Sequence, residues 1–217
     1  MQTLVLIDGN SLLNRAYYAT GHLSTKDGTP TNAVFGFIKL LLKLVDTFSP
    51  DKLIVTFDLK TPTFRHKMYE GYKATRKPMP DDLAVQVGTL KSLLASMHIA
   101  MCEKEGYEAD DLIGTLSHKF ADTKSIIVTG DRDSYQLVDA VTDVCFTKTG
   151  VSNLLHLTAE NFEQEVGYAP EQVIEMKALM GDSSDNIPGV AGVGEKTARM
   201  LIEQYGSGEN GYAHLGE

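Results

Sequence analysis

The sequence predicts an α/β fold, with a mostly parallel sheet flanked by helices. Short apolar runs rich in β-branched residues alternate with longer segments of helical periodicity, which is the order expected of parallel strands joined by crossover helices. Several of the short runs stop at an acidic residue. After residue 157 the pattern changes to helices joined by turns rich in glycine and proline.

The expected strands are the apolar runs at residues 3–7, 52–57, 98–102, 125–129 and 141–146. Helical spacing of apolar residues predicts helices at 12–19, 33–45, 81–97 and 109–120, with a helical turn at 134–138. Residues 61–80 lack apolar periodicity and contain Pro62, Pro78 and Pro80, so they are predicted to leave the sheet as a loop or excursion.

Composition bounds the class of protein. The chain has 217 residues, of which 42% are hydrophobic, enough for one large domain or a domain with a small appendage. No apolar run is long enough for a membrane span or a signal peptide, so we expect no membrane partner and a cytoplasmic location. We also expect a monomer. Cys102 and Cys145 lie apart from any metal-binding spacing and are interpreted as buried thiols.

The net charge of −9 is unevenly distributed. Between residues 60 and 77 a single acid, Glu70, accompanies a group of basic residues: Lys60, Arg65, Lys67, Lys73, Arg76 and Lys77. Elsewhere acids recur in close pairs. This distribution fits a protein that grips phosphate in one place and holds cations in another; the alternative is a solvated loop and ordinary surface acids.

Three expected strands are followed by acids: Asp8, Asp58, and the pair Asp131 and Asp133. A fourth group, Glu108, Asp110 and Asp111, lies at the start of the helix after Gly106. Because parallel strands bring their carboxyl ends together, these four groups should converge. A fifth group is Asp182 and Asp185 in the sequence GDSSDN.

Converging carboxylates repel one another, and divalent cations relieve the repulsion. Hard oxygen ligands suit Mg²⁺, or Mn²⁺ in its place, better than zinc, and two such ions can stabilise both oxygens of a displacement at phosphorus. A single aspartate could instead cap a helix, and Asp110 and Asp111 could favour a helix dipole. Those structural roles do not explain why acids recur along one edge.

Two further motifs suit nucleic acid. Residues 69–77 (YEGYKATRK) mix cations with aromatic rings; Lys73 and Arg76 would share a face if the segment is helical, as would Tyr69 and Tyr72. Residues 188–198 (PGVAGVGEKTA) alternate glycine with apolar residues before a helix, which allows close approach to a phosphate backbone. The spacing excludes a Walker A loop, and an ordinary solvated loop and glycine turn are the alternatives.

Taken in order, the motifs VLIDGNSLLNRAYY, FDLKTPTFRHKMYEGYKATR, GYEADDLIGTL, VTGDRDSYQL and MGDSSDNIPGVAGVGEKTA resemble the bacterial 5′-nuclease (flap endonuclease) family, which includes the N-terminal 5′-3′ exonuclease domain of bacterial DNA polymerase I. The resemblance covers residues 3–206. It implies a PIN-like (resolvase-like) core over 1–157 with a helical arch at 60–80. It also implies a helical DNA-binding subdomain over 158–206 with a helix–three-turn–helix element.

The resemblance also implies residue roles. Asp8, Asp58, Glu108 and Asp110 would bind one metal ion, with Asp111 beside them. Asp131, Asp133 and Asp185 would bind a second, with Asp182 nearby. Lys73 and Arg76 would steady the scissile phosphate, with Tyr72 and, less directly, Arg65 in the arch. The duplex and a K⁺ ion would contact the glycine hairpin, whose implied residues are Gly189, Gly192, Gly194, Lys196 and Thr197.

The expected function is therefore metal-dependent hydrolysis of branched or 5′-ended DNA in primer removal and repair, near the nucleoid, with a polymerase domain as a conceivable neighbour in the native chain. Residues 207–217 are expected to be a truncated, frayed or artificially added end. A DNA-binding module without catalysis and a PIN-type ribonuclease stay open. An aspartate-based phosphatase would need an acid at position 10, which is Asn10.

Overall fold

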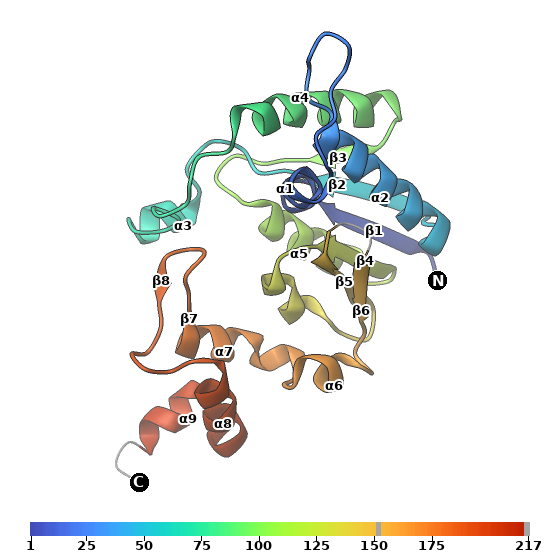
Figure 1. Ribbon diagram of the computed structural model, residues 1–217. Helices are drawn as coiled ribbons and strands as arrows, with labels where there is room; N and C mark the ends of the chain where they lie inside the picture. The colour runs from blue at the N-terminus through green and yellow to red at the C-terminus, as the bar shows by residue number, and fades with distance from the viewer. Residues whose placement is uncertain (151–152, 215–217) are drawn as a thin grey trace.

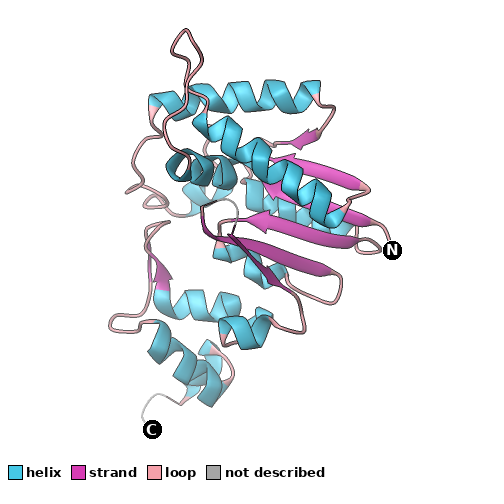
Figure 2. Ribbon diagram, turned by 45° about the vertical axis from the view of Figure 1, so that its right-hand side comes forward, coloured by secondary structure: helices cyan, strands magenta, loops and turns pink. Residues whose placement is uncertain are grey.

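The computed structural model describes residues 1–150 and 153–214. Its centre is a six-stranded sheet with the order β3-β2-β1-β4-β5-β6 (Figures 1 and 2). The strands are β1 (Thr3–Asp8), β2 (Lys52–Thr56), β3 (Ala100–Cys102), β4 (Lys124–Thr129), β5 (Thr142–Thr149) and β6 (Asn153–Leu157). Neighbouring strands from β3 across to β5 are parallel, and β6 is antiparallel to β5. The predicted parallel sheet is confirmed.

Helices cover both faces of this sheet, as the alternating pattern predicts. The helices of the core are α1 (Gly9–Ala19), α2 (Asn32–Phe48), α4 (Asp81–Ser96) and α5 (Ala109–Lys119), with a 3₁₀ turn, η1, at Arg132–Leu137. Alternate residues of β1 point to opposite faces: Val5 and Ile7 pack with Leu12 and Phe37 of α1 and α2, whereas Leu6 packs with α5 and η1.

The edge strand β6 was not predicted from the sequence. Its residues do not form the continuous apolar run of the central strands, and only Leu157 is fully buried. An edge strand is covered on one side only, so its pattern is weaker than that of a central strand. The formation of β6 therefore depends on its pairing with β5, which is itself held in the sheet by β4.

The segment 61–80 contains only a short helix, α3 (Phe64–Met68), followed by turns. Lys73 has a φ of 57°, in the left-handed region, so residues 69–77 do not continue the helix. The helical part of the expected arch is thus confined to α3. Lys73 and Arg76 lie in successive turns rather than on one helical face, and Arg76 N–H donates to the Lys73 carbonyl at 3.0 Å.

The chain after β6 is helical. Its elements are α6 (Phe162–Val166), the 3₁₀ turn η2 (Pro170–Gln172), α7 (Val173–Met180), the short strands β7 (Gly181–Asp182) and β8 (Ile187–Pro188), α8 (Glu195–Tyr205) and α9 (Gly208–Ala213). Phe162 and Val173 join the core beneath the sheet, while Met176 of α7 packs with Ile202 of α8 in a separate cluster. Helices α7 and α8 with the hairpin between them occupy the position of the expected helix–three-turn–helix element.

Helix α9 differs from the expected frayed end. Ser207 caps it by accepting a hydrogen bond from the Asn210 amide, and the Gly208 N–H donates to Glu175 of α7 at 2.9 Å. The rings of Tyr205 and His214 stack at 5.4 Å. Residues 207–214 therefore pack onto the helical subdomain, and residues 215–217 lie outside the described part. No helix in that described part combines the length and apolar character of a membrane span.

Candidate active site

The acids predicted at the strand ends line two adjoining cavities. One, of about 410 Å³, is lined by Asp8, Asp58, Glu108, Asp110 and Asp131. The other, of about 570 Å³, shares Glu108, Asp110 and Asp131 with the first and adds Asp111, Asp133, Asp182 and Asp185. Strands β1, β2 and β4 bring the first acids there from one edge of the sheet. The others come from the start of α5, the turn η1, strand β7 and the loop between β7 and β8. The structure thus brings the whole acidic set together.

Within this set, Asp8, Asp58, Asp110 and Asp131 have no ion-pair partner among the described residues. Asp8 accepts hydrogen bonds from the Ser11 amide at 2.9 Å and the Thr129 hydroxyl at 3.0 Å. Asp58 accepts one from the Ala109 amide at 2.7 Å. The Oδ1 atom of Asp110 is buried without any hydrogen-bond partner. We name these residues the unpaired quartet.

Burial and mutual repulsion make the negative charges of this region costly. Burial, together with the charges of Asp8 and Asp131, raises the pKa of Asp110 to about 8. Burial likewise raises the pKa of Asp8 to about 7, with a further contribution from Asp58. The pKa of Asp133 rises to about 6, because burial and Asp131 outweigh its contact with Lys177. A cation placed among these groups would relieve that cost.

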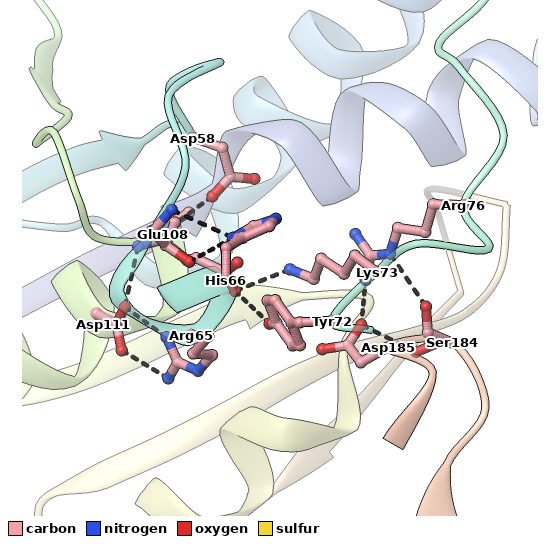
Figure 3. A network of polar contacts seen from close by, with 12 residues as sticks. Asp58, Arg65, His66, Tyr72, Lys73, Arg76, Glu108, Asp111, Ser184 and Asp185 are labelled. Carbon is pink, nitrogen blue, oxygen red and sulfur yellow. Dashed lines mark hydrogen bonds and ion pairs between the residues drawn. The ribbon is translucent and has the colours of Figure 1, made fainter. Parts of the chain in front are cut away.

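The remaining acids form ion pairs with cations from other segments, and Figure 3 shows the pairs at Glu108, Asp111 and Asp185. Lys73 Nζ donates to Glu108 at 2.8 Å, and Arg76 donates to Asp185 at 2.6 Å. Arg65 forms two hydrogen bonds of 2.8 Å with Asp111. With the side chains so arranged, no three of the described acids, histidines or cysteines have the geometry of a metal site. The cavity around the quartet nevertheless leaves space for ions.

Lys177 of α7 is a site residue that sequence reasoning missed. Its Nζ contacts Asp133 and lies 2.7 Å from an Asp182 oxygen. The contacts with Lys177 and Ser184 hold the pKa of Asp182 at about 2, although burial acts in the opposite direction. The available signal was a lone lysine in an apolar helix, five residues before an acid. A lysine in that pattern is ordinarily solvated, so the pattern alone does not identify it as a site residue.

Tyr72 lies inside the molecule rather than on its surface. The residue is 4% exposed, and its hydroxyl donates to Glu108 at 2.9 Å. Burial and this hydrogen bond raise the pKa of the phenol. In this conformation the buried ring cannot stack on an unpaired base, as an exposed aromatic ring in this segment could. Tyr69, by contrast, is exposed.

The glycine hairpin needs glycine where two backbones cross. A Cβ on Gly189 would lie 2.2 Å from the Met180 carbonyl carbon, and one on Gly181 would lie 2.3 Å from the Gly189 nitrogen. Gly192 has a φ of 80°, whereas a Cβ on Gly194 would meet nothing. Lys196 is exposed and Thr197 is half-buried in the first turn of α8. Gly194 provides no side chain to cap that helix, so its first amides are available to an anion.

Position 10 does not supply the second acid that a phosphatase would need. Asn10 is an amide, and its Oδ1 accepts a hydrogen bond from the Asp58 backbone N–H at 3.2 Å. Asp8 in turn caps α1 through the Ser11 amide. The Asn10 side chain therefore joins the start of α1 to the loop that follows β2.

Two family models match the chain. The model described as the 5′-3′ exonuclease N-terminal resolvase-like domain matches residues 3–167. The model described as the 5′-3′ exonuclease C-terminal SAM fold matches residues 168–217. The second match includes the residues expected to be an added end. It also begins later than the subdomain boundary expected after residue 157.

Curated relatives are similar over nearly the whole chain. A DNA polymerase I of Caldicellulosiruptor bescii is 44% identical over 216 residues, which is 98% of this chain and 25% of that protein. A 5′-3′ exonuclease of Bacillus subtilis is 43% identical over 207 residues, which is 93% of this chain and 70% of that protein. The chain thus spans about a quarter of the polymerase and 70% of the exonuclease.

Solved structures share the fold. The bacteriophage T5 D15 flap endonuclease, in a complex with DNA and metal ions, has a TM-score of 0.78 at 22% identity, over 99% of this chain and 79% of that one. The catalytic core of Rad2 with a DNA substrate has a TM-score of 0.62 at 16% identity, over all of this chain and 66% of that one. The matches of both family models and the 43% identity to a 5′-3′ exonuclease show that the chain belongs to the 5′-3′ exonuclease family.

Proposed function

We propose that this chain hydrolyses DNA phosphodiesters at 5′ ends and 5′ flaps with the help of divalent cations, of which Mg²⁺ suits the ligands best and Mn²⁺ can substitute. The observation that carries the proposal is the unpaired quartet around one cavity: burial raises the pKa values of Asp8 and Asp110, and one Asp110 oxygen has no hydrogen-bond partner. Such an arrangement is costly unless a cation enters, and carboxylate oxygens favour a hard dication.

The donor set fits two ions. Asp8, Asp58, Glu108 and Asp110 would hold the first, and Asp131, Asp133 and Asp185 the second, with Asp182 close by. Bound divalent ions supply Lewis-acid stabilisation of the charge on the attacking and leaving oxygens. For Glu108, Asp133 and Asp185 to take part, their present contacts with Lys73, Lys177 and Arg76 must be exchanged.

That exchange gives Lys73 and Arg76 their catalytic role. Both cations already lie at the rim of the acidic cavity, held by Glu108 and Asp185. When those acids turn to cations from solution, the ammonium and guanidinium groups become free to donate to the scissile phosphate. Charge-assisted hydrogen bonds of this kind stabilise the developing charge of the transition state. Tyr72 keeps its hydroxyl on Glu108 and helps orient that carboxylate.

The glycine hairpin is proposed to hold the duplex. Exposed backbone between Gly189 and Gly194 can approach a phosphate backbone closely, and Lys196 and the Thr197 hydroxyl lie at the start of α8. Carbonyl oxygens of the same hairpin could coordinate K⁺, as the resemblance implies. Contacts of this kind read shape and charge rather than base sequence, which suits a nuclease that selects DNA structure.

The relatives support the substrate class and leave its context open. The T5 neighbour is named a flap endonuclease and is bound to DNA, and the polymerase relatives are about four times as long as the matched segment. We infer that the chain acts on branched or 5′-ended DNA during primer removal and repair, at the nucleoid. It would do so as the nuclease part of a DNA polymerase I or as a stand-alone exonuclease.

The test uses substitutions that keep side-chain size. Asp131→Asn removes a charge from the quartet, and Asp185→Asn removes an acid paired with Arg76. Each is expected to lower cleavage of a labelled 5′-flap DNA in Mg²⁺ by on the order of 100-fold or more, because a metal contact contributes several kcal/mol to the transition state. Asp122→Asn, at an exposed position away from both cavities, is the control. Unchanged cleavage in both site variants would eliminate this function.

A substrate panel separates the alternatives. Matched flap, blunt-duplex and single-stranded substrates, made of DNA and of RNA, are incubated with the wild-type chain and Mg²⁺. Cleavage of the DNA flap well above the RNA forms is expected. Preferred cleavage of RNA would favour a ribonuclease, and tight flap binding without product would favour a binding module.

A further inference from the structure

Asp111 is bound differently from every other acid of the site. Both of its oxygens accept hydrogen bonds from the two terminal nitrogens of Arg65 at 2.8 Å, and one also accepts from the Glu108 backbone amide at 2.9 Å. A two-point guanidinium–carboxylate contact is stronger and more strictly oriented than the single contacts of Lys73 or Arg76. The remaining lone pairs of Asp111 are correspondingly less available to an ion.

The charge of Asp111 is already satisfied within the protein. Both of its oxygens are occupied by hydrogen bonds from Arg65, and one is also held by the Glu108 amide. In the neighbouring Asp110, by contrast, Oδ1 is buried without a hydrogen-bond partner. Asp110 lines the cavity of the unpaired quartet, and Asp111 lines only the second cavity. The adjacent residues Asp110 and Asp111 of α5 therefore differ in their need for a bound cation. Asp110 has an oxygen without a partner, whereas both oxygens of Asp111 are already hydrogen-bonded.

The contact with Arg65 also joins two segments. Helix α3 begins where the Phe64 amide donates to the Gly106 carbonyl at 3.1 Å, and the Phe64 ring lies 5.9 Å from that of Tyr107. Arg65 then reaches across to Asp111 in the first turn of α5. Figure 3 shows this pair beside Glu108 and on the other side of that carboxylate from Asp58. Together these contacts fasten the start of the segment that carries Lys73 and Arg76.

We propose that Asp111 is a positioning residue rather than a metal ligand: with Arg65 it fastens α3 to α5 and so holds the segment 64–77 over the acidic cavity. The proposal rests on the proposed function. It gives a separate role to Asp111, which the family resemblance groups with the residues of the metal site. It predicts that Asp111 and Arg65 act as one unit, and that Asp110 and Asp111 can be separated experimentally.

The first experiment measures metal binding directly. Metal-free wild type, Arg65→Gln, Asp111→Asn and Asp110→Asn are titrated with Mn²⁺ by calorimetry. Asp111→Asn keeps an oxygen for the Glu108 amide and should leave stoichiometry unchanged and affinity within about twofold, as expected for a residue independent of the ions. Asp110→Asn, the matched control on the same helix, should weaken binding by at least about tenfold or remove an ion.

The second experiment tests the pair as a unit. Hydrogen exchange of residues 64–77 and flap cleavage are measured for Arg65→Gln, Asp111→Asn and the double variant. Each single change should speed amide exchange in the segment by about threefold to tenfold, because either one removes a charge-assisted contact. Each should also lower kcat/KM by a similar factor. The double variant should be no worse than either single one, because the contact is lost once.

The outcomes distinguish this proposal from the proposed function. If Asp111→Asn loses affinity or an ion as Asp110→Asn does, while Arg65→Gln does not, Asp111 is a ligand and the proposal fails. Additive effects in the double variant would also overturn it. If the wild type binds no Mn²⁺ and cleaves nothing, the proposed function itself fails, and the exchange measurements still report whether Arg65 and Asp111 hold the segment.

Discussion

At the scale of single residues, the site is divided by charge compensation. Asp111 and Asp182 have pKa values below the ordinary value, because Arg65 and Lys177 supply hydrogen bonds. Asp8 and Asp110 have pKa values well above it, chiefly because they are buried. The charges of Asp111 and Asp182 are therefore compensated in the folded protein. Ionisation of Asp8 and Asp110, by contrast, destabilises the folded, metal-free protein.

This division gives a prediction for Asp110. Asp110→Asn should raise the free energy of unfolding of the metal-free protein at pH 8 by about 1–3 kcal/mol, because it removes a buried charge that has no partner. Chemical denaturation in excess chelator measures the change. The control is Asp143→Asn at a buried aspartate that forms an ion pair with Lys124 and also contacts the His156 ring. That variant should be destabilised, and a loss of stability in Asp110→Asn would contradict the reasoning.

At the scale of elements, the segment 61–80 is the least regular part of the site and carries the cations Lys73 and Arg76. Lys73 should contribute to catalysis rather than to folding, because its ammonium contacts the Glu108 carboxylate and the adjacent Tyr72 ring from a left-handed turn. Lys73→Ala is expected to lower flap cleavage by about 10²–10³-fold, as for loss of a donor to developing charge. Thermal unfolding should shift little. Lys67→Ala, at an exposed position of α3, is the control.

The hairpin between α7 and α8 makes a different prediction, because its glycines fill unequal spaces. Gly189→Ala should lower the stability by about 1–3 kcal/mol, since the new methyl group would overlap the Met180 backbone. Gly194→Ala should be tolerated, because its φ of −101° is ordinary and its Cβ would meet nothing. Thermal melts of both variants, with duplex binding measured alongside, check the contrast; equal melting temperatures would contradict it.

At the scale of the whole molecule, the raised carboxyl pKa values link stability to pH and metal. Between pH 4 and about 8, the folded metal-free chain binds protons at Asp8, Asp110 and Asp133 that the unfolded chain has released. The stability therefore falls as pH rises through this window. Divalent cations should reverse the trend, since they bind only the ionised, folded site.

The measurement is the melting temperature at pH 5.5 and pH 8, with chelator and with Mg²⁺. We expect the chelated protein to melt lower at pH 8 by several degrees, as about 1–2 kcal/mol shifts a chain of this size by that amount. Mg²⁺ should raise the melting temperature more at pH 8 than at pH 5.5. A metal-free protein that is more stable at pH 8 than at pH 5.5 would show that the acids are compensated in another way.

The fold and the position of the acidic site could be predicted from the sequence. Apolar runs such as that ending at Asp8 specify buried parallel strands, and parallel strands bring their ends to one edge whatever the details of packing. It was less informative where pairing or local turns decide, as in the edge strand β6, the short helix α3 within residues 61–80, and helix α9. These elements are stabilised by contacts with other segments, and the pattern of their own residues does not reveal those contacts.

Periodicity and strand-end acids, then, determine by themselves that an acidic cluster forms at one sheet edge of this protein. Only the tertiary structure decides which acids are already neutralised, because that depends on cations far away along the chain: Arg76 meets Asp185 across 109 residues, and Lys177 meets Asp133 across 44. An ion pair forms where folded segments happen to touch, whereas a strand carries its buried pattern in its own residues. The charge that remains unpaired at Asp110 is therefore a property of the fold.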